Sequence, residues 1–146
     1  MQQIEHVIIY GETDSSLCPR AASISFNIRG LDHGLVAAIL NDYYNIAVRN
    51  ECFCAHPYVK EMIIEEVMGA KVAEEVDFDA DIKVKAGMVR ASFGIYSTPK
   101  DVNALIIALK DIVAKRDKYS DLYQLDGTGI YRHKTFTPEE SDLFNV

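Results

Sequence analysis

The hydrophobic and polar positions of the chain follow two different periods, which predicts a protein that mixes strands and helices. Residues 5–11 and 22–28 have the short apolar or alternating pattern of strands, and a glycine ends or closely follows each stretch. Apolar positions three and four residues apart then predict a helix over residues 33–44. Asp32 stands directly before this helix and is a suitable N-cap.

The middle of the chain predicts one more short strand and a second helix. Residues 46–49 form a brief apolar stretch, and Pro57 suits the first turn of a helix that runs to about Met68. In residues 71–86, aspartates alternate with apolar residues, which favours an exposed loop or a short edge strand. A calcium loop would need a glycine and a distant glutamate that this stretch lacks, so we expect no calcium site.

The last predicted pair is a strand over residues 88–96 and the helix that follows it. Thr98 is a suitable N-cap, Pro99 fits the first helical position, and Asp101 places an acid in the first turn. Apolar residues at helical spacing continue to about residue 113. This helix has the strongest local signal in the chain.

The order of elements predicts an α+β fold, a mainly antiparallel sheet with helices packed on one face. The 146 residues are enough for one domain, which we place at residues 1–118. Residues 119–146 are polar and contain two of the glycines. We expect this tail to wrap the domain or to be mobile.

Composition excludes several classes of function. Hydrophobic residues make up 49% of the chain, yet no apolar run approaches the roughly 20 residues of a membrane span. The N-terminus lacks the pattern of a secretory signal, and three cysteines do not make a disulfide framework, so we expect a cytoplasmic protein. A net charge of -7 argues against a nucleic-acid partner, which would need clustered Lys and Arg.

Four short segments together resemble a known family. They are residues 25–30 (SFNIRG), 46–49 (IAVR), 54–57 (CAHP) and 89–98 (VRASFGIYST). Their order and spacing, from about residue 20 to residue 116, resemble the C-terminal small domain of class V aminotransferases. Within that family the chain is most similar to the cysteine desulfurase and selenocysteine lyase group.

The resemblance implies that the chain is one part of a larger enzyme that uses pyridoxal phosphate. In fold type I enzymes of this kind, a large domain binds the cofactor and supplies the Schiff-base lysine. That domain has no counterpart here, and His133-Lys134 in the polar tail does not replace it. The resemblance therefore implies a missing cofactor-binding domain or subunit as partner, an amino acid as substrate and a homodimer, with the chain inactive alone.

Arg90 and Cys54 are the candidate site residues that the resemblance supplies. Arg90 corresponds to the arginine that binds the α-carboxylate of the substrate, a task suited to the planar guanidinium; a structural ion pair is the alternative. Cys54 corresponds to the nucleophile that accepts sulfur as a persulfide, and a following helix would favour its thiolate. Cys52 and Phe53 stand where the family usually has histidine or another polar residue, and a buried structural cysteine is the alternative for Cys54.

Arg49 and His56 are possible residues of the same cleft. Arg49 either pairs with Glu51, which we favour, or meets the missing domain. His56 precedes a proline, so it is extended, and it either caps the helix or faces the cleft. The alternation of Cys52, Cys54 and His56 suits metal ligands, but a structural zinc site adds a second ligand pair at a distance, so we predict no metal site.

Two other functions stay open at this point. The chain could be a free-standing module for protein interaction or dimerisation, without catalysis. It could also be a persulfide carrier that uses Cys54.

Overall fold

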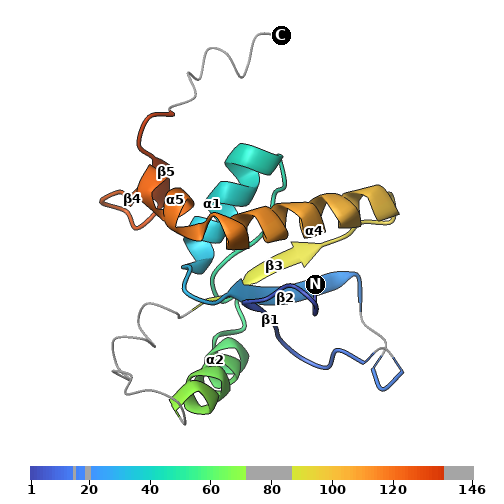
Figure 1. Ribbon diagram of the computed structural model, residues 1–146. Coiled ribbons are helices and arrows are strands. Elements are labelled where there is room, and N and C mark those ends of the chain that lie inside the picture. Colours follow the sequence, from blue (N-terminus) through green and yellow to red (C-terminus); the bar gives the residue numbers. More distant parts are fainter. Residues whose placement is uncertain (15, 19–20, 72–86, 137–146) are drawn as a thin grey trace.

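The computed structural model describes residues 1–14, 16–18, 21–71 and 87–136, and the expected loop or edge strand in residues 71–86 lies almost wholly outside them (Figure 1). The elements in chain order are β1 (Val7–Ile9), β2 (Ser23–Ile28), α1 (His33–Tyr44), α2 (His56–Lys71), β3 (Val89–Ser92), α4 (Pro99–Ala114), α5 (Arg116–Leu122), β4 (Tyr123–Leu125) and β5 (Tyr131–His133).

The central sheet is antiparallel, with strand order β1-β2-β3. Val7 of β1 lies opposite Ile28, and Val89 of β3 lies opposite Phe26. A separate two-stranded sheet joins β4 and β5. These sheets and helices confirm the predicted α+β fold with antiparallel pairing.

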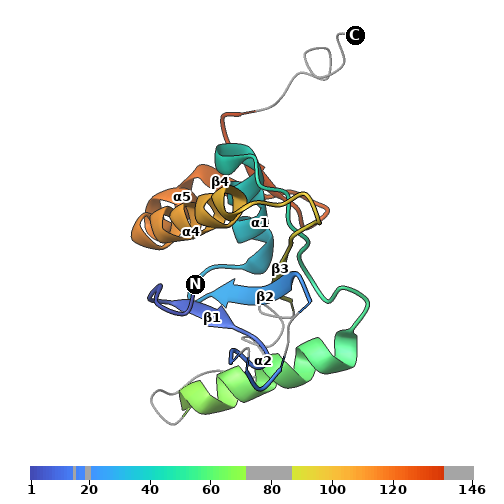
Figure 2. The same ribbon diagram turned by 90° about the vertical axis from the view of Figure 1, so that its right-hand side faces the viewer.

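The two faces of the central sheet bury different cores. Phe26, Ile28 and Val89 point into the main core, which α1 and α4 cover. Residues that alternate with these along the strands face the other side, where α2 lies across the sheet (Figure 2). The prediction placed the helices on one face of the sheet. Helices α1 and α4 form that layer, and α2 forms a second layer on the opposite face. The core under α2 consists of Tyr10, Val59, Ile63 and Met88, and we call it the α2 core.

Helices α1 and α4 begin at the N-cap residues that the sequence predicts. Asp32 accepts a hydrogen bond from the backbone N–H of Gly34 at 2.7 Å, as expected for the N-cap of α1. Thr98 and Asp101 form the reciprocal capping box that starts α4, where the Thr98 N–H donates to the Asp101 carboxylate at 2.6 Å. Both predicted helix starts are confirmed.

The strand predicted over residues 46–49 is wrong, because only Arg49 forms a bridge, with Arg90 of β3. Asn45 ends α1 in the left-handed conformation, with φ 54°. Just beyond Arg49, Glu51, Phe53 and Cys54 also have positive φ, at 76°, 50° and 63°. These positive φ values on both sides of the bridge prevent a regular strand, although the Glu51 carbonyl still accepts the N–H of Met88, just before β3, at 3.0 Å.

The packed part of the chain continues past the predicted boundary at residue 118, which falls inside α5. Tyr119 and Tyr123 are only 6% and 4% exposed and belong to the main core. Their hydroxyls donate to carboxylates, Tyr119 to Asp111 at 3.0 Å and Tyr123 to Asp42 at 2.8 Å. Polar composition concealed this segment, because its buried residues are tyrosines with satisfied hydroxyls.

Candidate carboxylate-binding site

Arg90 lies in the edge strand β3, on the face of the sheet that α2 covers. Its chain neighbours Val89 and Ala91 point into the main core, so the Arg90 side chain leaves from the opposite face. Ser25 of β2 is its partner on one side, and Arg49 is its partner on the other. The sheet therefore places Arg90 between a small hydroxyl residue and a second arginine.

Arg90 is half-buried, and its guanidinium lies over an aromatic ring. Its Cζ lies over Phe53, 5.0 Å from the ring centroid, and Phe53 itself packs against the α2 core. The buried Nε of Arg90 has no hydrogen-bond partner in the described part of the chain. A buried donor without an acceptor is uncommon, and an anion is the kind of partner that a guanidinium takes.

Arg49 strengthens the positive character of this position. The predicted pair with Glu51 is wrong, because neither Arg49 nor Arg90 forms an ion pair within residues 1–14, 16–18, 21–71 and 87–136. The backbone turns at Glu51, whose carbonyl instead accepts the N–H of Met88 at 3.0 Å. The exposed Arg49 and the half-buried Arg90 thus face the same side of the sheet without a described acid between them.

Cys54 lies in the short loop that joins this arginine pair to α2. Its side chain is exposed, and the residue stands two positions before the start of α2. The alternative of a buried structural cysteine therefore fits Cys52, which is half-buried and packs against the α2 core, rather than Cys54. His56 is exposed at the first position of α2.

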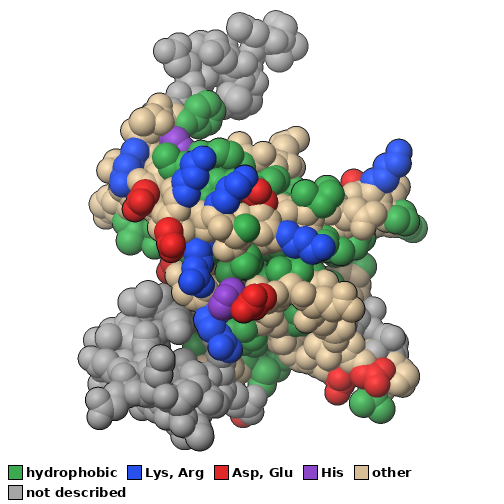
Figure 3. Space-filling model, in the orientation of Figure 1, with side chains coloured by type: hydrophobic (Ala, Val, Ile, Leu, Met, Phe, Trp, Pro, Cys, Tyr) green, Lys and Arg blue, Asp and Glu red, His purple; other side chains and the backbone are tan. Residues whose placement is uncertain are grey.

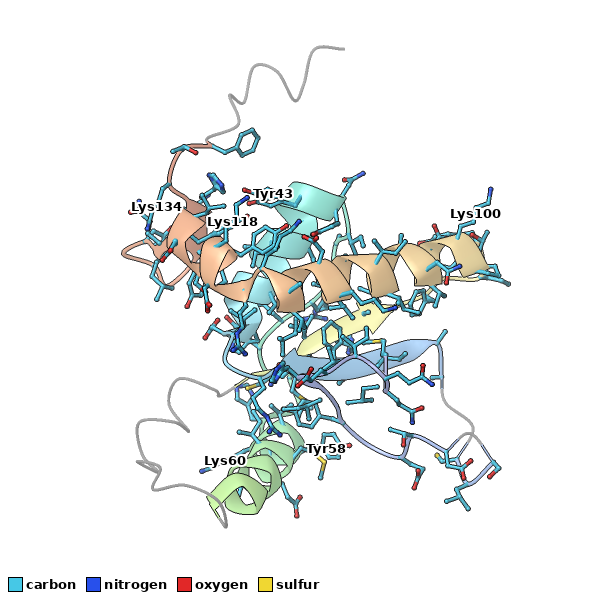
Figure 4. The ribbon with its side chains drawn as sticks, viewed as in Figure 1. Tyr43, Tyr58, Lys60, Lys100, Lys118 and Lys134 are labelled. Atoms are coloured by element: carbon cyan, nitrogen blue, oxygen red, sulfur yellow. The ribbon has the colours of Figure 1, made fainter. Side chains whose placement is uncertain are left out.

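Neither a metal nor a complete cofactor site is formed by the described residues. Within them, no three His, Cys, Asp or Glu side chains gather closely enough to hold a metal ion. A Schiff-base lysine is normally desolvated in a pocket, yet every lysine whose side chain is described is exposed. Figure 4 shows Lys100 at the start of α4, Lys118 and Lys134 around α5, and Lys60 on α2. These lysines do not fit the attachment of pyridoxal phosphate.

The surface adds two further observations. On the face seen in Figure 3, Lys and Arg side chains are interspersed with acidic and hydrophobic ones and form no continuous basic patch there. No helix in the described ranges is long and apolar enough to cross a membrane.

Comparison with known proteins decides the family. Residues 1–105 match the sequence model of the family described as Aminotransferase class-V. The chain belongs to the class V aminotransferase family. Among solved structures, the cysteine desulfurase CsdA of Escherichia coli, in its S-sulfonic acid form, matches with 23% sequence identity and a TM-score of 0.40. The match covers 74% of this chain and only 22% of the desulfurase. No curated protein sequence matches the chain.

The match to the family model confirms the resemblance seen in the sequence. Class V aminotransferases depend on pyridoxal phosphate in general. In this class V aminotransferase chain, one segment from Arg49 to Cys54 brings together the arginine pair and the exposed thiol. Sequence reasoning missed one member of the group, Phe53, because nothing in its sequence context signals a ring stacked on a distant arginine.

Proposed function

We propose that this chain is the substrate-binding small domain of a pyridoxal-phosphate-dependent class V enzyme, in which Arg90 binds the α-carboxylate of an amino acid. The observation that carries this proposal is Arg90, which is half-buried, has its guanidinium over the Phe53 ring and has no acidic partner in the described part of the chain. An arginine that served only in a structural ion pair with those residues would have such a partner.

The geometry of the pair suits a carboxylate. A guanidinium offers its N–H donors in one plane, and two of them match the two oxygens of a carboxylate. Arg49 lies beside Arg90 on the same face, which raises the local positive potential without occupying the donors of Arg90. A mobile anion in solution, rather than an acidic side chain of the described residues, is then the natural partner.

Cys54 is the residue that we assign to sulfur acceptance, if the intact enzyme follows the desulfurase branch. It is exposed, and it directly follows the residue that contacts Arg90. A substrate held by its carboxylate at Arg90 would thus lie near a thiol that can take up sulfur as a persulfide. Cys54→Ser should abolish sulfur transfer and leave carboxylate binding in place. The first is measured with polysulfide as donor: the Cys54 thiolate takes the terminal sulfur as a persulfide and releases a polysulfide one sulfur shorter. Peptide mass spectrometry then locates the added sulfur and distinguishes Cys54 from Cys18 and Cys52.

The cofactor and its lysine belong, in this proposal, to a part of the enzyme outside these 146 residues. The chain covers 22% of the similar desulfurase, and its described lysines do not fit the cofactor. We therefore expect the chain alone, with added pyridoxal phosphate, to leave cysteine unchanged. Formation of alanine from cysteine by the purified chain would contradict this expectation.

Carboxylate binding at Arg90 is testable on the chain itself. In a ¹⁵N NMR titration with L-alanine, we expect the Arg90 Nε–H signal to shift and saturate, together with the backbone N–H signals of residues 49–54 and 89–91. The backbone signals give the affinity in every variant, including those that lack Arg90. Arg90→Lys keeps the charge but loses the planar fork, and should weaken binding roughly 10- to 100-fold, the equivalent of about 1.5–3 kcal/mol for a charged hydrogen bond. Arg29→Lys, at an exposed position, is the matched control. Equal affinity in all three proteins would refute the assignment.

A second candidate is an interaction module, supported by exposed apolar residues near the start of α4. Ile95 is 105% exposed and Tyr96 is 86% exposed, both in the loop between β3 and α4. Beside this loop, an open apolar depression of about 230 Å³ includes Phe93, Val102 and Leu105 in its lining. If the chain dimerises through this surface, Ile95→Asp with Tyr96→Asp should yield a monomer in analytical ultracentrifugation. The control is Lys100→Asp, because Lys100 is exposed. Val113 packs on the main core, so a charge at that position would disturb the fold itself.

A further inference from the structure

Phe53 is the described side chain that holds the Arg90 guanidinium in place. The Cζ atom of Arg90 lies over its ring at 5.0 Å from the centroid. The guanidinium has no ion pair in the described part of the chain, and its Nε has no hydrogen-bond acceptor there. Among the described residues, the contact that orients the Arg90 guanidinium is therefore aromatic rather than polar.

We propose that Phe53 is a positioning residue that presents Arg90 to the substrate carboxylate, an inference that rests on the proposed function. The Cζ atom of Arg90 lies over the face of the Phe53 ring, and a phenyl ring has no oxygen or nitrogen that could accept from the N–H donors of a guanidinium. The ring thus fixes the cation and competes with none of its donors. An acidic side chain in the same place would fix the cation equally well but would occupy the donors that the substrate needs.

The loop around Phe53 is built to hold this ring. Phe53 has φ 50°, between Glu51 at 76° and Cys54 at 63°, and such conformations in residues other than glycine persist only where the surroundings impose them. The N–H of Ala55 donates to the carbonyl of Cys52 at 2.7 Å, which closes a turn around Phe53. The ring also packs against the α2 core, which helps to hold it in position.

The same loop links substrate recognition to the thiol. Cys54 directly follows Phe53 and shares its left-handed backbone conformation. A change that moves Phe53 therefore displaces the support of Arg90 and the backbone of Cys54 together. Phe53 would serve as the common anchor of the two candidate site residues, although it touches neither the substrate nor the sulfur.

The test compares aromatic and aliphatic residues at position 53 in the full chain. The ¹⁵N-labelled protein is titrated with L-alanine, and the backbone N–H signals of residues 49–54 and 89–91 give the dissociation constant in every variant, with the Arg90 Nε–H signal as a second reporter where Arg90 is present. Phe53→Leu keeps apolar volume but removes the ring face, and should raise the dissociation constant about three- to tenfold, the usual range for a cation–π contact. Phe53→Tyr retains the ring and should stay within about twofold of the wild type. Phe53→Met is a second aliphatic variant, in case Phe53→Leu does not fold.

The outcomes separate this inference from the function on which it rests. If Arg90→Lys weakens binding while both aliphatic variants bind like the wild type, Phe53 does not position Arg90 and only the inference fails. If Phe53→Tyr weakens binding as much as Phe53→Leu, the ring face is not the cause and the inference also fails. If the wild type gives no saturable shift with L-alanine, the proposed function is wrong, and the inference that rests on it is wrong as well.

Discussion

Arg49 and Arg90 lie directly opposite one another and exchange both of their backbone hydrogen bonds, at 3.1 Å from Arg49 N–H and 2.7 Å from Arg90 N–H. In an antiparallel pair, residues that are directly opposite send their side chains to the same face. Two arginines at such a position repel each other unless an anion lies between them. The fold tolerates this pair at the edge of β3, beside Phe53 and next to the loop that carries Cys54.

The repulsion between the arginines predicts that Arg49→Gln stabilises the protein when no carboxylate is bound. Like charges at opposite positions of a strand pair are destabilising, so the free energy of unfolding should rise by about 0.2–1 kcal/mol. Urea denaturation at low salt measures it, and the gain should shrink as salt screens the charges. Lys60→Gln, on the exposed side of α2, is the control and should change little. A loss of stability in Arg49→Gln would mean that Arg49 has an acidic partner after all.

The network around Asp111 predicts a pH dependence of stability. The Lys115 ammonium, 2.6 Å away, and the hydroxyls of Tyr44 and Tyr119 lower the pKa of the Asp111 carboxyl. A carboxyl whose pKa is lower in the folded protein stabilises it fully above the pKa of the unfolded chain, about 3.9. This stabilisation is lost as the pH falls from that value through the lower pKa of Asp111 in the folded protein.

Asp111→Asn tests that network because it keeps the shape and removes the charge. At pH 7 the variant should be less stable by about 1 kcal/mol, and the difference from the wild type should narrow below about pH 4. Chemical denaturation across pH 3–7 gives both values. The control is Asp117→Asn, whose side chain is 98% exposed and should leave the pH profile unchanged. A constant difference at all pH values would show that the Asp111 charge is not the cause.

The buried tyrosines of the C-terminal segment predict that the domain cannot end at residue 118. A chain cut there loses Tyr119 and Tyr123 from the main core and leaves Asp42 and Asp111 without those hydroxyls. We expect the free energy of unfolding to fall by about 3 kcal/mol or more, as for removal of large core aromatics. A chain ending at residue 136 keeps both tyrosines and is the control. Equal stability of the two truncated chains would restore the boundary at residue 118.

The sequence predicted those features whose causes are local. Asp32 and Thr98 cap helices with their own neighbouring backbone, so α1 and α4 begin where the sequence indicates. The site needed more than local information. Arg90 and Cys54 were named from the family resemblance, whereas the contact of Arg90 with Phe53 joins residues 37 positions apart and depends on three left-handed residues in a loop.

The C-terminal hairpin shows a signal that could have been used. Asp126-Gly127 stands between two short apolar stretches, which is a strong hairpin pattern, and β4 and β5 pair on either side of it. The polar composition of residues 119–146 outweighed that pattern in the prediction. Buried tyrosines whose hydroxyls meet Asp42 and Asp111 look polar in a sequence but fill a core in the fold.

The measurement that tests the central claim most directly is the location of the cofactor in the native protein. An antibody to this chain would isolate the protein from its source cells, borohydride would reduce any Schiff base, and peptide mass spectrometry would locate the pyridoxyl-lysine. We expect a pyridoxyl-lysine in a peptide outside residues 1–146, either on a longer chain or on a partner subunit. A pyridoxyl-lysine within these residues, or isolated protein that carries no cofactor at all, would contradict it.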